Sequence, residues 1–246
     1  MERVLIFGAT SAIAAEVAVL HARRGDRLHL VGRNAAKLAA VAARCDGAQV
    51  TTAVADLDRT EAAAGLVDAA VGALGGLDRV LIAHGELGDQ LATERDFATA
   101  EAIFRTNLLS AVALVIPVAN RFEAARGGRL GVITSVAGDR GRPRNYTYGS
   151  AKGALTLYLQ GVRTRLYTVG VKVTTLKLGP VDTPMTRDHT KHAAFGKPVP
   201  VAASIVAAMD AGVPEAYIPG FWRLVMPVVR NMPEAVLQRL SFLSGR

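Results

Sequence analysis

Short runs of aliphatic and β-branched residues alternate along the chain with longer stretches rich in alanine and leucine. The short runs are mostly unbroken by polar residues, which is typical of strands that are covered on both faces. They predict strands at residues 3–7, 27–31, 49–54, 79–83, 130–134 and 171–178. The longer stretches predict helices at residues 13–24, 35–44, 59–74, 98–118 and 146–169.

The repeated change from strand to helix predicts one α/β domain with a doubly wound parallel sheet and helices on both faces. In such a sheet, ligands bind beyond the carboxyl ends of the strands. Five residues fall at or just past the ends of predicted strands: Gly8, Asp56, Ala83, Ser135 and Gly179. We therefore expect these residues to lie along one edge of the sheet.

Size and composition narrow the class of protein. The chain has 246 residues, half of them hydrophobic, which is enough for one large core. Its one cysteine, Cys45, excludes an internal disulfide and favours a reducing compartment, so we expect a cytoplasmic protein. Residues 1–8 form a predicted strand and not the apolar core of a signal peptide. No run of eighteen apolar residues predicts a membrane-spanning helix.

The formal net charge of +8 needs an explanation. There is no Lys/Arg block with interleaved aromatic residues, so a nucleic-acid partner is not predicted. Two interpretations remain open. The charge is either a basic, solvated surface, or it serves anionic ligands such as a dinucleotide, a phosphorylated substrate or an acidic membrane surface.

The candidate chemistry lies in Ser135, Tyr148 and Lys152. Tyr148 and Lys152 are four residues apart in a predicted helix and therefore share one face. Ser135 ends the apolar run that begins at Leu130, where a strand reaches the rim of the sheet. A nearby ammonium favours the phenolate, so we expect Lys152 to lower the pKa of Tyr148. Together the three groups can polarise a carbonyl and protonate it, which is ketone chemistry. For the Tyr–Lys pair alone, a packing aromatic and a solvated lysine remain the alternative.

With residues 8–14, Gly-Ala-Thr-Ser-Ala-Ile-Ala, these features resemble the short-chain dehydrogenase/reductases over essentially the whole chain. The resemblance implies a single-domain Rossmann fold, a nicotinamide dinucleotide as cofactor and no metal site. The family pattern in this loop is Gly-x-x-x-Gly-x-Gly, and Ala12 and Ala14 replace two of its glycines. Each adds a methyl group where the backbone approaches a pyrophosphate or packs on a strand. We expect a slightly shifted loop that still binds.

By resemblance, the catalytic residues are Asn107, Ser135, Tyr148 and Lys152, with Asn107 holding a water molecule beside the lysine. The implied cofactor site comprises Gly8, Thr10, Ser11, Ala12, Ile13, Arg33, Asp56, Leu57, Ala83, Gly85, Tyr148, Lys152, Val181 and Thr183. For Asp56 the alternative is an exposed helix cap, and for Asn107 a satisfied polar group in the core. The family's Asn-Ala-Gly after the fourth strand is here Ala83-His84-Gly85, and we interpret His84 as a packing or rim residue and not as a catalyst.

The end of the second predicted strand bears on the choice of cofactor. An NAD site usually places a carboxylate there for the ribose 2′-hydroxyl. Residues 30–34 contain no acid but do contain Arg33. A guanidinium suits a 2′-phosphate through two hydrogen bonds. NADP(H) is therefore favoured over NAD(H), unless Arg33 points to solvent.

Two further segments of the sequence bear on the identity of the substrate. Residues 135–152 and 217–233 are similar to the decaprenylphosphoryl-2-keto-ribose reductase group, which reduces a keto sugar carried on a polyprenyl phosphate. Residues 217–246 hold four arginines and one glutamate among apolar residues, including Trp222 and Phe242. We interpret this segment as a lid, an oligomer-packing helix or an element that contacts the inner face of the membrane. Arg140, Arg142 and Arg144 either meet a substrate phosphate or are solvated loop charges.

Three functional interpretations therefore stay open. The first is a ketone reductase, or the reverse alcohol dehydrogenase, acting on a lipid-linked sugar. The second is the same chemistry on a soluble small molecule. The third is a dinucleotide-binding protein without catalysis, for which the altered glycine loop is the best argument. The resemblance also implies a homo-oligomer, because family members often pair through their long helices.

Overall fold

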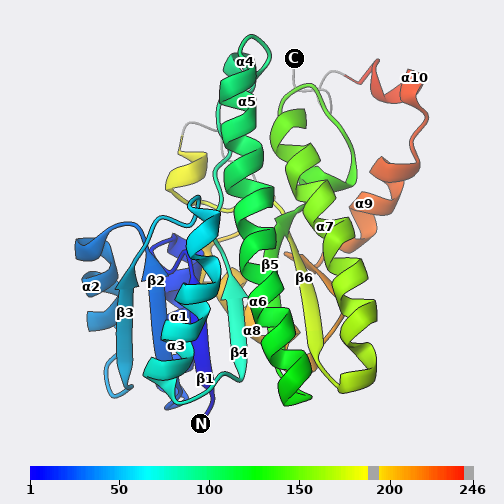
Figure 1. Ribbon diagram of the computed structural model, residues 1–246. Coiled ribbons are helices and arrows are strands. Elements are labelled where there is room, and N and C mark those ends of the chain that lie inside the picture. The colour runs from blue at the N-terminus through cyan, green and yellow to red at the C-terminus, as the bar shows by residue number, and fades with distance from the viewer. Residues whose placement is uncertain (188–193, 241–246) are drawn as a thin grey trace.

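The structure, a computed structural model, describes residues 1–187 and 194–240 and is built on a seven-stranded sheet. The strand order is β3-β2-β1-β4-β5-β6-β7, and each neighbouring pair is parallel. The strands are β1 Arg3–Phe7, β2 Arg27–Gly32, β3 Val50–Val54, β4 Arg79–Ile82, β5 Arg129–Ser135, β6 Lys172–Leu178 and β7 Glu215–Ile218. Their carboxyl ends meet at the upper edge in Figure 1.

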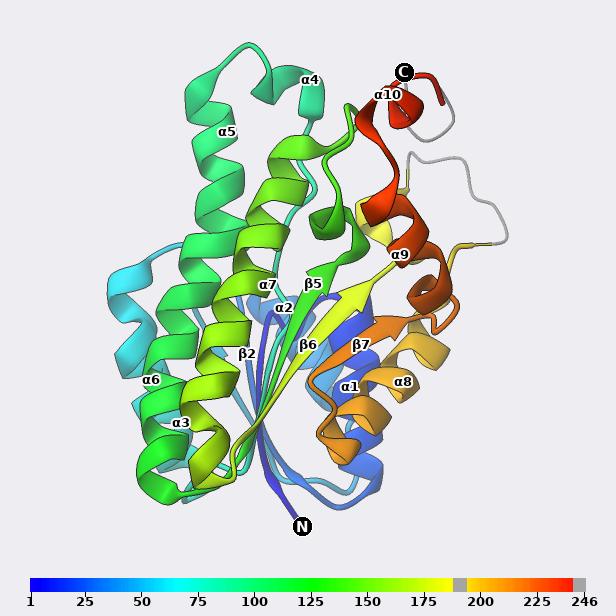
Figure 2. The ribbon, with the colours of Figure 1, turned by 90° about the vertical axis from the view of Figure 1, so that its right-hand side faces the viewer.

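Helices cover both faces of this sheet in two layers (Figure 2). One face carries α1 Ala12–Arg23, α2 Ala35–Ala43 and α8 Pro198–Ala211. The other carries α3 Ala63–Leu74, α6 Ser110–Ala125 and α7 Tyr146–Leu166. Each face encloses its own apolar cluster, and the strands are buried between the two. The predicted doubly wound parallel sheet is confirmed.

Apart from one long helix, the predicted elements agree with the structure to within a few residues. The strand β7, the helix α8 and the short helix α4 Gln90–Thr93 were not predicted. The helix predicted at residues 59–74 begins with a 3₁₀ turn, Thr60–Ala62, and continues as α3. The helix predicted at residues 146–169 consists of α7 and a 3₁₀ turn, Tyr167–Val169, that ends at Gly170.

One long helix differs from its prediction in extent and in form. It was expected at residues 98–118 but is continuous from Phe97 to Ala125. It consists of α5 Phe97–Phe104, a π-helical turn Arg105–Leu109, and α6. By length and composition this helix is apolar enough to cross a bilayer. Half of its most apolar stretch is buried, and α6 packs between α3 and α7, so it is a core helix.

The C-terminal segment lies over the carboxyl edge of the sheet (Figures 1 and 2). Its first two residues belong to β7, so they are part of the sheet and not of a separate tail. Two helices follow, α9 Trp222–Asn231 and α10 Glu234–Leu237. Phe242, which the sequence analysis placed in this segment, lies outside the described residues.

Candidate active site

The first turn after β1 brings the backbone close to the end of β4. Gly8 has a φ of +74°, a conformation that glycine adopts without strain. A Cβ atom at this position would lie only 2.6 Å from the backbone nitrogen of His84. Gly8 therefore satisfies two requirements at once, a left-handed turn and a close backbone approach. The turn leads into the N-terminus of α1, where folds of this type bind a phosphate group.

The remainder of this loop forms the start of α1. Thr10, Ser11, Ala12 and Ile13 are half-buried along it. Ser11 caps the helix, since its hydroxyl accepts a hydrogen bond from the backbone N–H of Ala14 at 3.2 Å. The N-terminus of a helix carries partial positive charge and free N–H groups, so this end suits a pyrophosphate.

The two alanines that replace family glycines cause no visible conflict. The side chain of Ala14 is fully buried in the apolar cluster between α1 and the sheet. Ala12 is the first residue of α1 and stays half-buried. The added methyl groups are therefore accommodated by packing and leave the helix N-terminus open to a dinucleotide.

The adenosine end of the predicted cofactor site is marked by Arg33, Asp56 and Leu57. Arg33 directly follows β2 and is exposed. Asp56 is also exposed, and its carboxylate accepts a hydrogen bond from the backbone N–H of Asp58 at 3.2 Å. The side chain of Leu57 is buried in the core, so only its backbone is left for a ligand. Both charged side chains lie at the carboxyl edge.

Asn107, Gly85 and Lys152 converge after β4. The Asn107 amide donates to the carbonyl of Glu86 at 2.7 Å and accepts from the Glu86 N–H at 3.1 Å. A Cβ on Gly85 would lie 2.7 Å from Asn107 Oδ1 and 3.1 Å from Lys152 Nζ. The amide and the ammonium therefore flank one glycine. The π-helical turn carries Asn107 here, and π-turns often occur at functional sites.

Ser135, Tyr148 and Lys152 lie together at the end of β5. Ser135 is the last residue of that strand, and its hydroxyl accepts from the Ala137 N–H at 3.1 Å. Tyr148 and Lys152 lie one turn apart on α7, with the ammonium 5.8 Å from the centre of the phenol ring. Lys152 Nζ also donates to the carbonyl of Ile133 at 3.3 Å. One strand end and one helix thus supply all three groups.

Burial determines the protonation states of Tyr148 and Lys152. Burial raises the pKa of the Tyr148 phenol to about 12, even though a side-chain hydrogen bond with Ser135 acts to lower it. Burial also lowers the pKa of Lys152 to about 8. The prediction that Lys152 lowers the pKa of this phenol is wrong, because the pKa is raised. At neutral pH the phenol is protonated and the lysine is mostly charged, which suits a proton donor.

A seam of glycines, which the sequence analysis missed, brings Ser135 and Tyr148 together. After β5 the chain makes a 3₁₀ turn, Val136–Asp139, that packs directly on α7. A Cβ on Gly138 would lie 2.6 Å from the Gly153 nitrogen, and one on Gly149 would lie 2.7 Å from the Ala137 carbonyl oxygen. The turn and the helix approach backbone to backbone. The two glycines at positions 149 and 153 are one helical turn apart, and this spacing is the sequence signal that could have predicted the close contact.

The remaining predicted residues lie near the same edge. Ala83 follows β4, and its N–H donates to the carbonyl of Phe7. Val181 is buried, and its carbonyl accepts from the Thr186 hydroxyl at 2.6 Å. Thr183 is half-buried at the start of a 3₁₀ turn, Pro184–Thr186.

His84 has a definite structural partner. Its Nε2 lies 2.7 Å from the hydroxyl of Ser110 at the start of α6. Burial, together with the charges of Lys152 and Arg33, lowers the pKa of His84 to about 3, so the ring is neutral. These contacts agree with the interpretation of His84 as a packing residue.

Two of the three loop arginines remain candidates for an anionic substrate. Arg140 forms an ion pair with Glu234 of α10, and it also donates to the Arg230 carbonyl at 3.4 Å. Its charge is therefore engaged with the C-terminal segment. Burial lowers the pKa of Arg142, and the neighbouring charge of Arg144 lowers it further.

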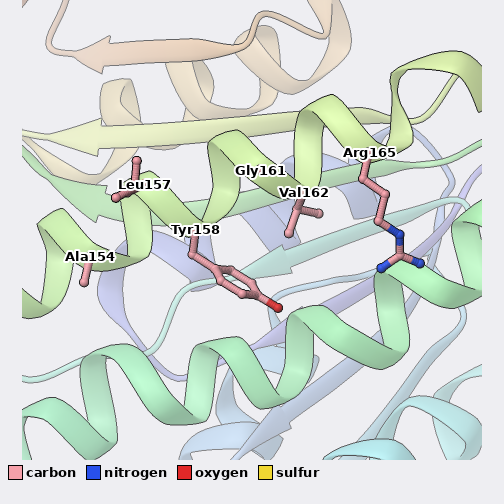
Figure 3. A pocket seen from close by; sticks show the side chains of 6 residues that line it. All are labelled: Ala154, Leu157, Tyr158, Gly161, Val162 and Arg165. Carbon is pink, nitrogen blue, oxygen red and sulfur yellow. The ribbon is translucent and has the colours of Figure 1, made fainter.

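A pocket of about 540 Å³ lies elsewhere, on the outer side of α7 facing α6 (Figure 3). It is lined by Ala154, Leu157, Tyr158, Gly161, Val162 and Arg165. Neither Ser135 nor Tyr148 belongs to its lining, so it is not part of the candidate active site. It lies on the two long helices through which the resemblance implies pairing, and the homo-oligomer stays a prediction.

Comparisons with known proteins agree with this geometry. A family model described as short chain dehydrogenase matches residues 2–194. An uncharacterized oxidoreductase of Mycobacterium tuberculosis is 36% identical over 240 residues, covering 96% of each chain. One from Streptomyces coelicolor is 34% identical over 242 residues, covering 96% of this chain and 94% of the relative.

Solved structures give the same fold. Levodione reductase superposes with a TM-score of 0.82 at 23% identity, covering 90% of this chain and 97% of its own. A short chain dehydrogenase/reductase family protein superposes with a TM-score of 0.79 at 26% identity, covering 89% and 97%.

Proposed function

Because the chain belongs to the short chain dehydrogenase family, we propose that it reduces a ketone with NADP(H), using Ser135, Tyr148 and Lys152. The observation that carries this proposal is the convergence of these three side chains at the end of β5. The same edge holds Gly8 and the open N-terminus of α1, which suit the phosphates of a dinucleotide.

A dinucleotide held at Gly8 and the N-terminus of α1 would supply a hydride to the carbonyl carbon. In this proposal, Tyr148 gives its proton to the carbonyl oxygen, so that a ketone, a hydride and a proton become a secondary alcohol. Ser135 donates a hydrogen bond to the same oxygen as negative charge develops there. Lys152 holds positive charge beside the phenol, and Asn107 fixes the chain at Glu86 next to that lysine.

The two catalytic interpretations and the non-catalytic one are separated by a simple assay. Purified protein is mixed with NADPH and a panel of ketones, from the cyclic keto-lactam isatin to the keto sugar of a polyprenyl phosphate. Oxidation of NADPH that depends on a ketone supports the proposal. Tight binding of NADPH without turnover of any ketone would favour a binding protein. Identifying the product of the keto sugar tests the lipid-linked substrate.

Arg33→Ala is expected to weaken NADPH binding and to leave NADH binding unchanged. A hydrogen bond to a charged group contributes about 1.5–3 kcal/mol, so the Kd for NADPH should rise roughly 10- to 100-fold. Fluorescence titration with each reduced dinucleotide measures both constants. The matched control is Arg44→Ala, because Arg44 is also an exposed arginine but pairs with Glu16 at 2.6 Å. Equal weakening for both dinucleotides would exclude a contact with the 2′-phosphate.

For the substrate, we propose a lipid-linked ketone, and α9 supports this choice. Met226 and Val229 on one side of α9 pack against Val136, next to Ser135. The other side is apolar and exposed, with Leu224 at 78% and Val228 at 64%. The same helix carries two arginines, Arg223 and Arg230. An apolar face with basic neighbours favours contact with anionic lipid or a prenyl chain.

Leu224→Glu is expected to release the protein from vesicles. The wild-type protein should float with vesicles that contain anionic lipid. The variant should bind them roughly 10- to 100-fold more weakly, because a buried leucine contributes about 1.5–3 kcal/mol. Leu157→Glu is the matched control, since Leu157 is 69% exposed but lies on α7 beside the pocket of Figure 3. If the wild-type protein stays with the soluble fraction, a soluble ketone becomes the better substrate.

A further inference from the structure

A buried cluster of charged groups lies behind the turn that follows Ser135. Lys177 of β6 places its ammonium 2.9 Å from the Asp139 carboxylate and 3.0 Å from that of Glu215. The hydroxyl of Tyr217 donates to the other oxygen of Asp139 at 2.6 Å. The side chains of Lys177 and Asp139 are only 3% and 4% exposed. Two carboxylates thus share one ammonium within the protein.

Two members of the cluster, Lys177 and Tyr217, keep their protons at neutral pH. Burial alone would lower the pKa of Lys177, but hydrogen bonds with Asp139 and Glu215 raise it overall. Burial and the hydrogen bond to Asp139 both raise the pKa of Tyr217, so its phenol stays neutral and donates. The Asp139 carboxylate therefore accepts hydrogen bonds from two groups that keep their protons, Lys177 of β6 and Tyr217 of β7.

Asp139 differs from the other members because it belongs to the turn of the candidate site. That turn, Val136–Asp139, directly follows Ser135 and ends at Asp139. Lys177, by contrast, lies in the sheet, paired in register with Thr134 and with Tyr217. The cluster therefore ties the far end of the Ser135 turn to rigid strands. The glycine seam with α7 holds the middle of the same turn.

We propose that Asp139 is a positioning residue, which fixes the Ser135 turn through Lys177 and Tyr217 and so sets Ser135 opposite Tyr148. This inference rests on the proposed function, because the position of Ser135 matters only if its hydroxyl assists proton transfer. Catalytic groups must be held closely, since a misplacement of about 1 Å can cost roughly 100-fold in rate.

The test compares Asp139→Asn with Glu215→Gln. Both remove one negative charge from the same ammonium, but only the first touches the turn. With isatin and NADPH, Asp139→Asn should lower kcat roughly 100-fold while the Kd for NADPH stays unchanged. Glu215→Gln should lower the Tm but keep kcat. Emission from Trp222, the one tryptophan, should shift to the red in Asp139→Asn alone, because Trp222 packs beside Val136.

Two outcomes overturn the inference: full kcat in Asp139→Asn, or equal losses of kcat in both variants, which would make the cluster a general stabiliser of the sheet. If Asp139→Asn does not fold, Tyr217→Phe replaces it, since that variant removes one hydrogen bond and keeps the ion pair. It should lower kcat by less, and an unchanged kcat would overturn the inference. A Tyr148→Phe variant that keeps its turnover overturns the proposed function instead, whatever Asp139 does.

Discussion

Tyr148→Phe is expected to lower kcat for ketone reduction by at least about 100-fold, because general acid catalysis usually contributes 10²–10⁴-fold. The variant removes one hydroxyl and keeps the ring, so the packing of α7 is preserved. Binding of NADPH should remain near normal, since the backbone at Gly8 and the start of α1 are untouched. Steady-state kinetics with isatin and a fluorescence titration with NADPH measure the two effects separately.

A second tyrosine on the same helix provides the control for this variant. Tyr158 also lies on α7, but it lines the pocket that faces α6 (Figure 3). Tyr158→Phe should therefore keep kcat. If Tyr148→Phe retains more than roughly a hundredth of the wild-type rate, Tyr148 is not the general acid. A loss of NADPH binding in Tyr148→Phe would instead indicate a damaged site.

Gly153→Ala is expected to impair both folding and catalysis. The added methyl would lie 2.8 Å from the carbonyl oxygen of Gly138, so either the turn or α7 must move. Overpacking of this kind typically lowers the free energy of unfolding by about 1–3 kcal/mol. Because the turn carries Ser135, the same shift should lower kcat roughly 100-fold. Urea unfolding and steady-state kinetics measure the two consequences.

Gly72→Ala is the control, because Gly72 lies inside α3 and a Cβ there would meet nothing within 4 Å. This variant should be more stable than wild type by about 0.5–1 kcal/mol, owing to the higher helix propensity of alanine. If Gly153→Ala keeps the wild-type kcat, the prediction is wrong, because the Val136–Asp139 turn and α7 can then separate without effect on the reaction.

The fold was largely predictable because long, periodic elements carry a strong signal. The omissions have physical reasons. The strand β7 is only four residues long and lies between Pro214 and Pro219. The helix α8 contains Pro198 and Pro200, which interrupt the apolar pattern. In the structure both prolines lie in the first turn of the helix, where the missing N–H leaves no hydrogen bond unmade.

The candidate site was predictable in its position but not in its electrostatics. Each strand end named from the sequence lies at the carboxyl edge, because parallel strands align their ends. The pKa of Tyr148 was expected to fall, yet burial raises it. Burial depends on how α7 packs against the turn after β5, which no local pattern reports. The role of Asp139 depends in the same way on two strands more than thirty residues away in sequence.

The π-helical turn that carries Asn107 makes this helix sensitive to length in a way that substitutions do not reveal. Successive residues of an α-helix are rotated by about 100°. A π-helical turn holds one residue more than an α-helical turn, so removing one residue from Arg105–Leu109 would regularise the hydrogen bonds but shift Asn107 relative to α6. Either Asn107 would leave Glu86 or the buried face of α6 would turn to solvent. Insertions and deletions should therefore be excluded from these five positions, even where exchanges of side chains are tolerated.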